Sequence, residues 1–154
     1  MVEIILYNAG WHQAFKQLNL EWLDKFNLRE EADMIVLNDP QAQVINKGGV
    51  IYLAKAGNTI VGTAALIHEG HDVYELAKMS VTEQWQGKGI SKQLLEACLK
   101  KAAELGAKKV ELFSNHQLQH ALKLYEKYGF NYVDVKDSPF ETADIKMELI
   151  LETT

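Results

Sequence analysis

YELAKMSVTEQWQGKGISKQLLEACLKKAAEL, residues 74–105, changes its hydrophobic periodicity part-way along. Residues 74–81 alternate and end on a β-branched valine, which predicts a strand. From Ile90 to Leu105 the apolar residues recur every three or four positions, which predicts an amphipathic helix. Between the two lies the glycine-rich turn Gln86-Gly87-Lys88-Gly89-Ile90-Ser91. This order of strand, glycine turn and helix organises the rest of the chain.

The glycine turn predicts an anion-binding site. The first N–H groups of a helix have no internal partner, and the helix dipole favours negative charge at that end. Gly87 and Gly89 lack a Cβ, so the backbone can approach a ligand closely. Lys88 and Lys92 add positive charge nearby. We therefore expect a ligand that carries phosphate.

Two common phosphate-binding motifs do not fit this turn. The P-loop requires G-x-x-x-x-G-K-[ST], but Thr82 stands at its first glycine and Gly89 follows Lys88 where Ser or Thr is needed. The dinucleotide fingerprint requires G-x-G-x-x-G after the first strand, but Lys92 replaces its last glycine and the turn lies mid-chain. A nucleoside-triphosphate protein is therefore disfavoured.

The turn instead resembles motif A of the GCN5-related N-acetyltransferases (GNATs), Q/R-x-x-G-x-G/A. Gln86 matches its first position and Gly89 its fourth, while Ser91 stands where the family usually has Gly or Ala. Because serine is small, we expect a modest local adjustment. Residues 121–130, ALKLYEKYGF, resemble a second family segment, A-x-x-L-Y-x-K-x-G-F. Together the resemblance covers roughly residues 50 to 150.

The remaining periodicities predict an α+β fold in one domain over residues 1–154. The expected helices are 11–26, 40–47, 90–105 and 118–128, and residues 28–38 have no clear assignment. The expected strands are 2–6, 50–56, 59–68, 74–81, 108–113, 130–136 and 145–151. We thus expect a mixed, mostly antiparallel central sheet of about seven strands flanked by about four helices. Strands 74–81 and 108–113 should be parallel because a helix connects them. The resemblance implies a GNAT-like acyl-CoA N-acyltransferase fold, splayed between these fourth and fifth strands.

Composition excludes several classes of protein. The net charge of −5 lacks the basic footprint of nucleic-acid binding, and no run approaches the roughly 20 apolar residues of a membrane span. The first residues do not resemble a signal peptide, and the single Cys98 is expected to be buried; both favour a cytoplasmic location. His68, His71, His116 and His120 lack an accompanying ligand set, so no metal is expected.

The resemblance implies acetyl-CoA as acyl donor and co-substrate. Backbone groups of Met79 and Val81 would pair with the pantetheine arm as an added strand does. Asn115 would also bond the pantetheine, although it could equally cap the following helix. The implied binding residues are Met79, Val81, Gln86, Gly87, Lys88, Gly89, Ile90, Ser91, Lys92 and Asn115.

Two residues are candidates for catalysis. The resemblance places Tyr125 beside the coenzyme sulfur, where its phenol would protonate the leaving thiolate; the alternative is a core aromatic residue. Glu75 opens the strand before the glycine turn, where the family often has a glutamate that acts as base directly or through water. His68 and His71 are alternative bases, and Glu75 could also be a solvated strand end.

The predicted function is transfer of an acetyl group from acetyl-CoA to a primary amine, directly within a ternary complex. The alternative is a non-catalytic acyl-CoA-binding sensor or regulatory module of the same fold. The acceptor groove should lie between residues 11–47 and the 136–144 loop. Glu21, Asp24, Glu30, Glu31 and Asp33 would favour a cationic small molecule or peptide lysine, unless they form a solvated helix face. A homodimer is left open.

Overall fold

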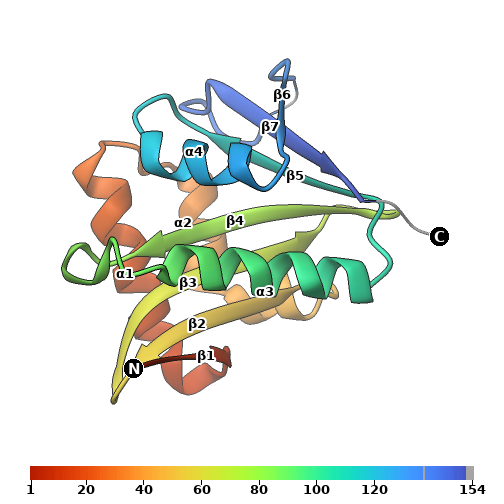
Figure 1. Ribbon diagram of the computed structural model, residues 1–154. Coiled ribbons are helices and arrows are strands. Elements are labelled where there is room, and N and C mark those ends of the chain that lie inside the picture. Colours follow the sequence, from red (N-terminus) through yellow and green to blue (C-terminus); the bar gives the residue numbers. More distant parts are fainter. Residues whose placement is uncertain (137, 152–154) are drawn as a thin grey trace.

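The computed structural model describes residues 1–136 and 138–151, and in this part of the chain one seven-stranded sheet runs through the protein (Figure 1). Its spatial order is β1-β2-β3-β4-β5-β7-β6. The strands are β1 (Val2–Leu6), β2 (Val50–Ala56), β3 (Thr59–His68), β4 (Val73–Val81), β5 (Lys109–Ser114), β6 (Asn131–Val133) and β7 (Ile145–Ile150). Every neighbouring pair is antiparallel except β4 and β5, which are parallel. The predicted mixed sheet is therefore confirmed.

Helices cover both faces of the sheet. Helices α3 (Ile90–Glu104) and α4 (Gln119–Lys127) lie on one face, in front in Figure 1, and α1 (His12–Lys25) and α2 (Glu31–Asn38) lie on the other. Each face has its own apolar core because side chains alternate across a strand. Leu94, Leu95 and Cys98 of α3 are fully buried in one core, and Phe15 of α1 and Leu37 of α2 in the other.

The parallel strands β4 and β5 stay together for only a short distance. They pair through Val73–Glu75 and Lys109–Glu111, after which each continues with its outer neighbour alone. β4 remains paired with β3 as far as Val81, and β5 with β7 as far as Ser114. The splay expected between the fourth and fifth strands is thus present, and it begins immediately after Glu75.

A β-bulge lies in β4 just beyond this point. Thr63 pairs with Ser80 and Ala65 with Ala77, so β4 has one more residue here than β3. Lys78 has a left-handed backbone (φ 52°), and its carbonyl accepts a hydrogen bond from the Thr63 hydroxyl at 2.7 Å. A bulge bends its strand and interrupts the alternation of side chains. As a result the consecutive residues Ala77 and Lys78 both face the α1 and α2 side.

Three expectations about elements need correction. Residues 28–38, left unassigned, contain helix α2, which is capped by Glu30 and Asp33 in place of the usual Ser or Thr signature. The helix expected at 40–47 is a single π-helical turn, Gln41–Ile45. The strand expected at 130–136 is only Asn131–Val133, and Asp137 in the following loop lies outside the described residues.

Cys98 is fully buried, as expected, and burial raises the pKa of its thiol to about 12. No helix within the described residues is long and apolar enough to cross a membrane. Nor does this part of the chain bring three or more His, Cys, Asp or Glu side chains together as a metal site.

We predict that Thr63→Val destabilises the fold through the bulge. The change keeps the side-chain shape but leaves the buried Lys78 carbonyl without its donor and removes an acceptor from Asn19. An unsatisfied buried polar group costs about 1–3 kcal/mol, so the free energy of unfolding in urea should fall by that amount. Thr59→Val, at the exposed start of the same strand, is the control and should change it little. Equal stability of the two variants would contradict the role of this hydrogen bond.

Candidate active site

The glycine turn forms an open cradle of backbone donors before α3. Gly87 and Gly89 have left-handed backbones, with φ of 77° and 80°, and a Cβ added to either would meet no protein atom within 4 Å. Gly89 is the N-cap of α3, and no side chain caps the helix. Within the described residues, the N–H groups of Gly87, Lys88 and Gly89 have no protein acceptor. The turn therefore fits a phosphate group, whose oxygens accept from such donors.

The other residues predicted for this turn have different surroundings. Lys88 and Ser91–Lys92 lie at the surface, with the Lys88 ammonium 6.0 Å from the centre of the Trp85 ring. Ile90 is buried in the core, so only its backbone can face a ligand. The Gln86 side chain donates to the Val81 carbonyl at 2.9 Å, which ties the turn back to the end of β4. Gln86 thus shapes the turn through its side chain.

A pocket with a cavity volume of about 70 Å³ lies on the opposite face, where β4 and β5 separate. Ala77 and Lys78 of β4 and Phe113 and Ser114 of β5 form its floor. Its other walls come from α1, from α2 and the segment that leads to it, and from the loops after β5 and before β7: Trp22, Leu23, Leu28, Asp33, Asn115, Leu118, Phe140, Thr142 and Ala143. Residues of the 11–47 region and residues 140–143 therefore line it, and its use as the acceptor groove stays a prediction.

Glu75 lines this pocket and is the last residue of β4 that pairs with β5. Its side chain is buried, with 7% of the residue exposed. The pKa of its carboxyl is raised to about 8, first by burial and then by the hydrogen bond to Glu69 and the nearby charges of Glu69 and Glu111, whereas the Lys78 ammonium lowers it. A carboxyl with this pKa can take up a proton near neutral pH, as a general base must. Glu75 is thus not a solvated strand end.

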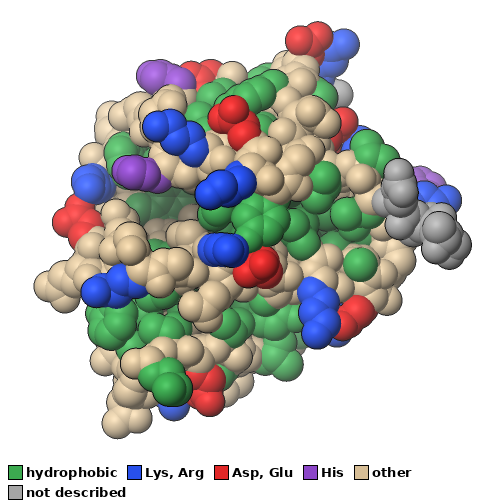
Figure 2. Space-filling view, in the orientation of Figure 1, with side chains coloured by type: hydrophobic (Ala, Val, Ile, Leu, Met, Phe, Trp, Pro, Cys, Tyr) green, Lys and Arg blue, Asp and Glu red, His purple; other side chains and the backbone are tan. Residues whose placement is uncertain are grey.

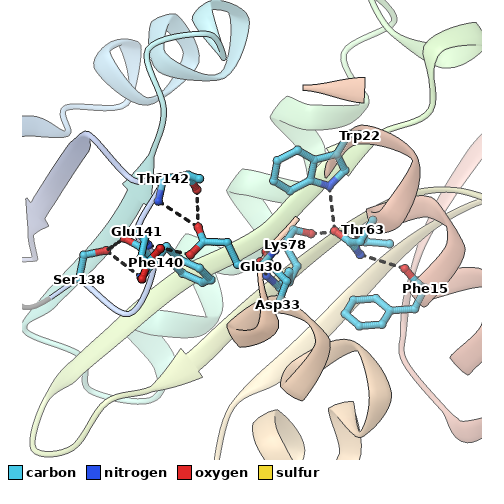
Figure 3. A network of polar contacts seen from close by, with 11 residues as sticks. Phe15, Trp22, Glu30, Asp33, Thr63, Lys78, Ser138, Phe140, Glu141 and Thr142 are labelled. Carbon is cyan, nitrogen blue, oxygen red and sulfur yellow. Dashed lines mark hydrogen bonds and ion pairs between the residues drawn. The ribbon is translucent and has the colours of Figure 1, made fainter. Parts of the chain in front are cut away.

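Sequence reasoning missed a buried ion pair beside Glu75. Lys78 Nζ contacts Asp33 Oδ1 at 2.5 Å, and both side chains are 4% exposed. The other Asp33 oxygen accepts from the Glu30 N–H, and the Lys78 ammonium lies 5.1 Å from the centre of the Phe140 ring. Figure 3 shows these groups in one polar network that joins α1, the bulge and the 138–142 loop. The signal was a lysine whose neighbours in the strand, Leu76, Ala77 and Met79, are apolar.

The same network holds the loop over the pocket. The Glu30 carboxylate accepts from the backbone N–H of Glu141 and from both the N–H and the hydroxyl of Thr142 (Figure 3). Partial burial alone would raise the pKa of Glu30, but these hydrogen bonds and the Lys78 charge outweigh it and the pKa is lowered. Asn115 donates to the Thr142 carbonyl at 2.8 Å and accepts from Gln117 N–H. Both ends of the Asn115 amide therefore have protein partners, and its pantetheine contact stays a prediction.

Tyr125 lies on the other face of the sheet from Glu75. It is buried in the core between α3 and α4, with its ring 5.7 Å from that of Phe130. Burial, with a smaller effect of Cys98, raises the pKa of its phenol well above its ordinary value. The two candidate catalytic side chains therefore lie on opposite faces of the sheet, and their joint action stays a prediction. Figure 2 shows a hollow with hydrophobic side chains between α4 and the start of α3, on the Tyr125 face.

Met79 and Val81 both pack toward the α3 core, so they face the same way, as expected. The Val81 carbonyl is occupied by Gln86, and the Lys78 carbonyl by Thr63.

Among the predicted acidic residues, Glu21 bonds the Thr82 hydroxyl, Asp24 pairs with Arg29 and Asp33 with Lys78. Asp33 is thus buried within the protein, whereas Glu21, Asp24 and Glu31 lie exposed at the surface.

Comparison with known proteins identifies the family. A model of the acetyltransferase (GNAT) family matches residues 11–130. The chain belongs to this family. An uncharacterized N-acetyltransferase of Bacillus subtilis (strain 168), YvbK, is 33% identical over 101 residues, which cover 64% of this chain and 65% of YvbK. The chain spans less than two thirds of the length of the curated relatives it matches first.

Solved GNAT structures share the fold. A GNAT acetyltransferase from Staphylococcus aureus Mu50 superimposes with a TM-score of 0.92 at 23% identity and covers 99% of this chain and 100% of its own. The PaiA N-acetyltransferase of Thermoplasma acidophilum, solved in complex with coenzyme A, has a TM-score of 0.77 at 19% identity, with 98% and 99% coverage. At these identities the likeness shows the fold alone. The resemblance inferred from the two motifs is confirmed.

We predict that Gly89→Val weakens acetyl-CoA binding at least about tenfold, or 1.4 kcal/mol. The added side chain would project into the open cradle and strain a left-handed backbone. Gly106→Val is a matched control at the other end of α3, with φ 78° and likewise no atom within 4 Å. It carries the same backbone strain away from the cradle. Calorimetry should show weaker acetyl-CoA binding only for Gly89→Val. Equal losses of affinity in the two variants would mean that acetyl-CoA binds elsewhere.

Proposed function

We propose that this GNAT protein transfers an acetyl group from acetyl-CoA to a primary amine, directly within a ternary complex. The observation that carries the proposal is the position of Glu75, a buried carboxyl with a pKa near neutrality where β4 and β5 separate. The phosphate cradle lies at the far end of the same strand. One strand therefore connects a group that can accept a proton with a site that fits the donor.

The donor fits the residues on the Tyr125 face. Gly87, Lys88 and Gly89 offer free N–H groups for a pyrophosphate, with Lys88 and Lys92 close by as countercharges. The edge of β4 at Met79 offers backbone groups for the pantetheine arm, in the manner of an added strand. When bound, acetyl-CoA supplies an activated acetyl group. The protein has only to hold the two reactants in line, which can account for much of the rate.

Glu75 is proposed to accept the proton that the amine loses as its nitrogen forms the new bond to the acetyl carbon. Its burial makes the ionised form a stronger base than an exposed carboxylate. Lys78 lies close enough to lower the pKa, so the ionised form remains accessible. A transfer through an intervening water uses the same group. The pocket walls leave room for the acceptor beside this carboxyl.

Tyr125 is proposed to donate a hydrogen bond to the sulfur as the carbon–sulfur bond breaks and the coenzyme departs as its thiolate. Its pKa is raised far above that of a thiol, which is about 8.5, so complete proton transfer from the phenol is uphill. A hydrogen bond to the thiolate avoids this difficulty and still stabilises the departing charge. The phenol stays protonated at all physiological pH values and is always ready to donate.

We predict that kcat/KM rises with pH, passes half of its maximum near pH 8 and levels off above it, because Glu75 must be ionised to act as base. Glu75→Gln should remove this limb and lower kcat/KM by about 10²–10⁴-fold. Glu69→Gln is a second test, because it removes a neighbouring charge that raises the Glu75 pKa. The pH profile of kcat/KM for this variant should therefore shift to lower pH. The measurement is thiol release against pH for all three proteins. Binding of acetyl-CoA with no turnover of any amine would instead indicate the sensor alternative.

We predict that Tyr125→Phe lowers kcat by about 10- to 100-fold while acetyl-CoA affinity changes little. A hydrogen bond to a charged group is worth about 1.5–3 kcal/mol, which corresponds to that loss if sulfur departure limits the rate. The ring and its packing on Phe130 are kept, so the melting temperature should stay near that of the wild type. Tyr128→Phe, one turn away and partly exposed, is the control. Wild-type kcat in Tyr125→Phe, with chemistry shown to be rate-limiting, would leave Tyr125 as a core aromatic.

A further inference from the structure

The charges in the pocket at the β4–β5 opening are balanced. Among the described residues that line it, the ionisable side chains are Asp33, Glu75 and Lys78. Asp33 and Lys78 neutralise each other in the buried ion pair, and the Phe140 ring lies against the Lys78 ammonium. Glu75 has no ion pair within the described residues and is the remaining group that can meet the acceptor amine. The pocket thus has no spare fixed charge for a second charged group.

The polar groups of the pocket wall are also largely occupied. The Trp22 indole donates to Asn19, and both ends of the Asn115 amide have protein partners. The N–H and hydroxyl of Thr142 both bond to Glu30. Ser114 adds a neutral hydroxyl. What remains for an acceptor to contact is mainly the apolar surface of Trp22, Phe113, Phe140 and the neighbouring leucines.

We propose, on the basis of the acetyl transfer proposed above, that the acceptor is a small primary monoamine with an aromatic or aliphatic body and no second charge. A second ammonium or a carboxylate would be desolvated in this pocket without a partner, which is strongly unfavourable. The aromatic walls favour a flat apolar body instead. This differs from the cationic acceptor suggested by residues 21–33, because Asp33 is the acid of that stretch that lines the pocket and it is paired with Lys78.

The test compares four acceptors that share one phenylethyl body with the polyamine spermidine. Thiol release is measured at pH 8.5 and saturating acetyl-CoA. 2-Phenylethylamine has no second charge, L-phenylalanine adds a carboxylate, and L-phenylalaninamide adds a neutral group of similar size. 4-(Aminomethyl)phenylethylamine adds a second ammonium, and spermidine represents a flexible polyamine. We expect kcat/KM for phenylethylamine to exceed that for the diamine and spermidine at least tenfold. Phenylalaninamide should exceed phenylalanine by a similar factor.

Each other outcome overturns a defined part of the proposal. Faster acetylation of phenylalanine than of its amide would mean that Lys78 binds a carboxylate. Preference for the diamine or spermidine would mean that a carboxylate of the pocket is free for a second ammonium. Acetyl-CoA binding by calorimetry without turnover of any of the five amines would instead refute the proposed transferase activity, and the acceptor class with it.

A variant tests the charge balance itself. Asp33→Asn keeps the side-chain shape but leaves the Lys78 charge uncompensated, so the rate ratio of phenylalanine to phenylalaninamide should rise at least tenfold. Asp24→Asn is the matched control, because Asp24 is an acid of α1 that pairs with Arg29 at the surface. Melting temperatures show whether each variant is folded. If Asp33→Asn does not fold, the comparison of the five amines on the wild-type protein decides the proposal. An unchanged ratio in folded Asp33→Asn would overturn the role of the ion pair.

Discussion

The active site depends on one extra residue in β4. The bulge at Lys78 places the side chains of Ala77 and Lys78 on the same face of the sheet and bends β4 beyond Glu75. From Leu112 onward, β5 has no strand partner on the side that faces β4. The left-handed backbone of a lysine is unfavourable in itself, so it must be held by its surroundings. The Thr63 hydroxyl holds the carbonyl of Lys78, and Asp33 holds its side chain. Helix α2 is thereby fixed to the sheet at the point where the sheet opens.

The buried ion pair has a second effect, on the acid–base chemistry of its neighbour. Burial with Glu69 and Glu111 nearby raises the pKa of Glu75, and the Lys78 ammonium opposes this. Removing Lys78 would leave Asp33 as an uncompensated buried charge and would also raise the Glu75 pKa further. A buried ion pair is weak evidence for added stability, because the desolvation of both ions offsets their attraction. Its position beside Glu75 suggests that its contribution here is to the balance of charge in the pocket.

The sequence predicted the elements that have strong periodicity and the motifs that act through the backbone. The strand, glycine turn and helix of residues 73–104 lie where alternation, glycine and helical spacing put them. It did not reveal α2, because Glu30 caps the helix where Ser or Thr is usual. Nor did it show that Lys78 meets Asp33, since a contact between residues 45 positions apart depends on the bulge. The acids of residues 21–33 could be read as an acidic groove or as a solvated helix face, because sequence alone does not tell which carboxylates find partners within the protein.

The separation of Glu75 from Tyr125 follows from the chemistry they are proposed to perform. One group must accept a proton from the nitrogen that attacks, and the other must donate to the sulfur that departs, so the reacting carbon has to lie between them. A site on a single face of the sheet would force both reactants to enter from one side. Here β4 and β5 part directly after Glu75, beside the pocket on the α1 and α2 face. In the proposed reaction this opening in the sheet is the place where a donor bound on the α3 and α4 face meets an acceptor bound on the other face.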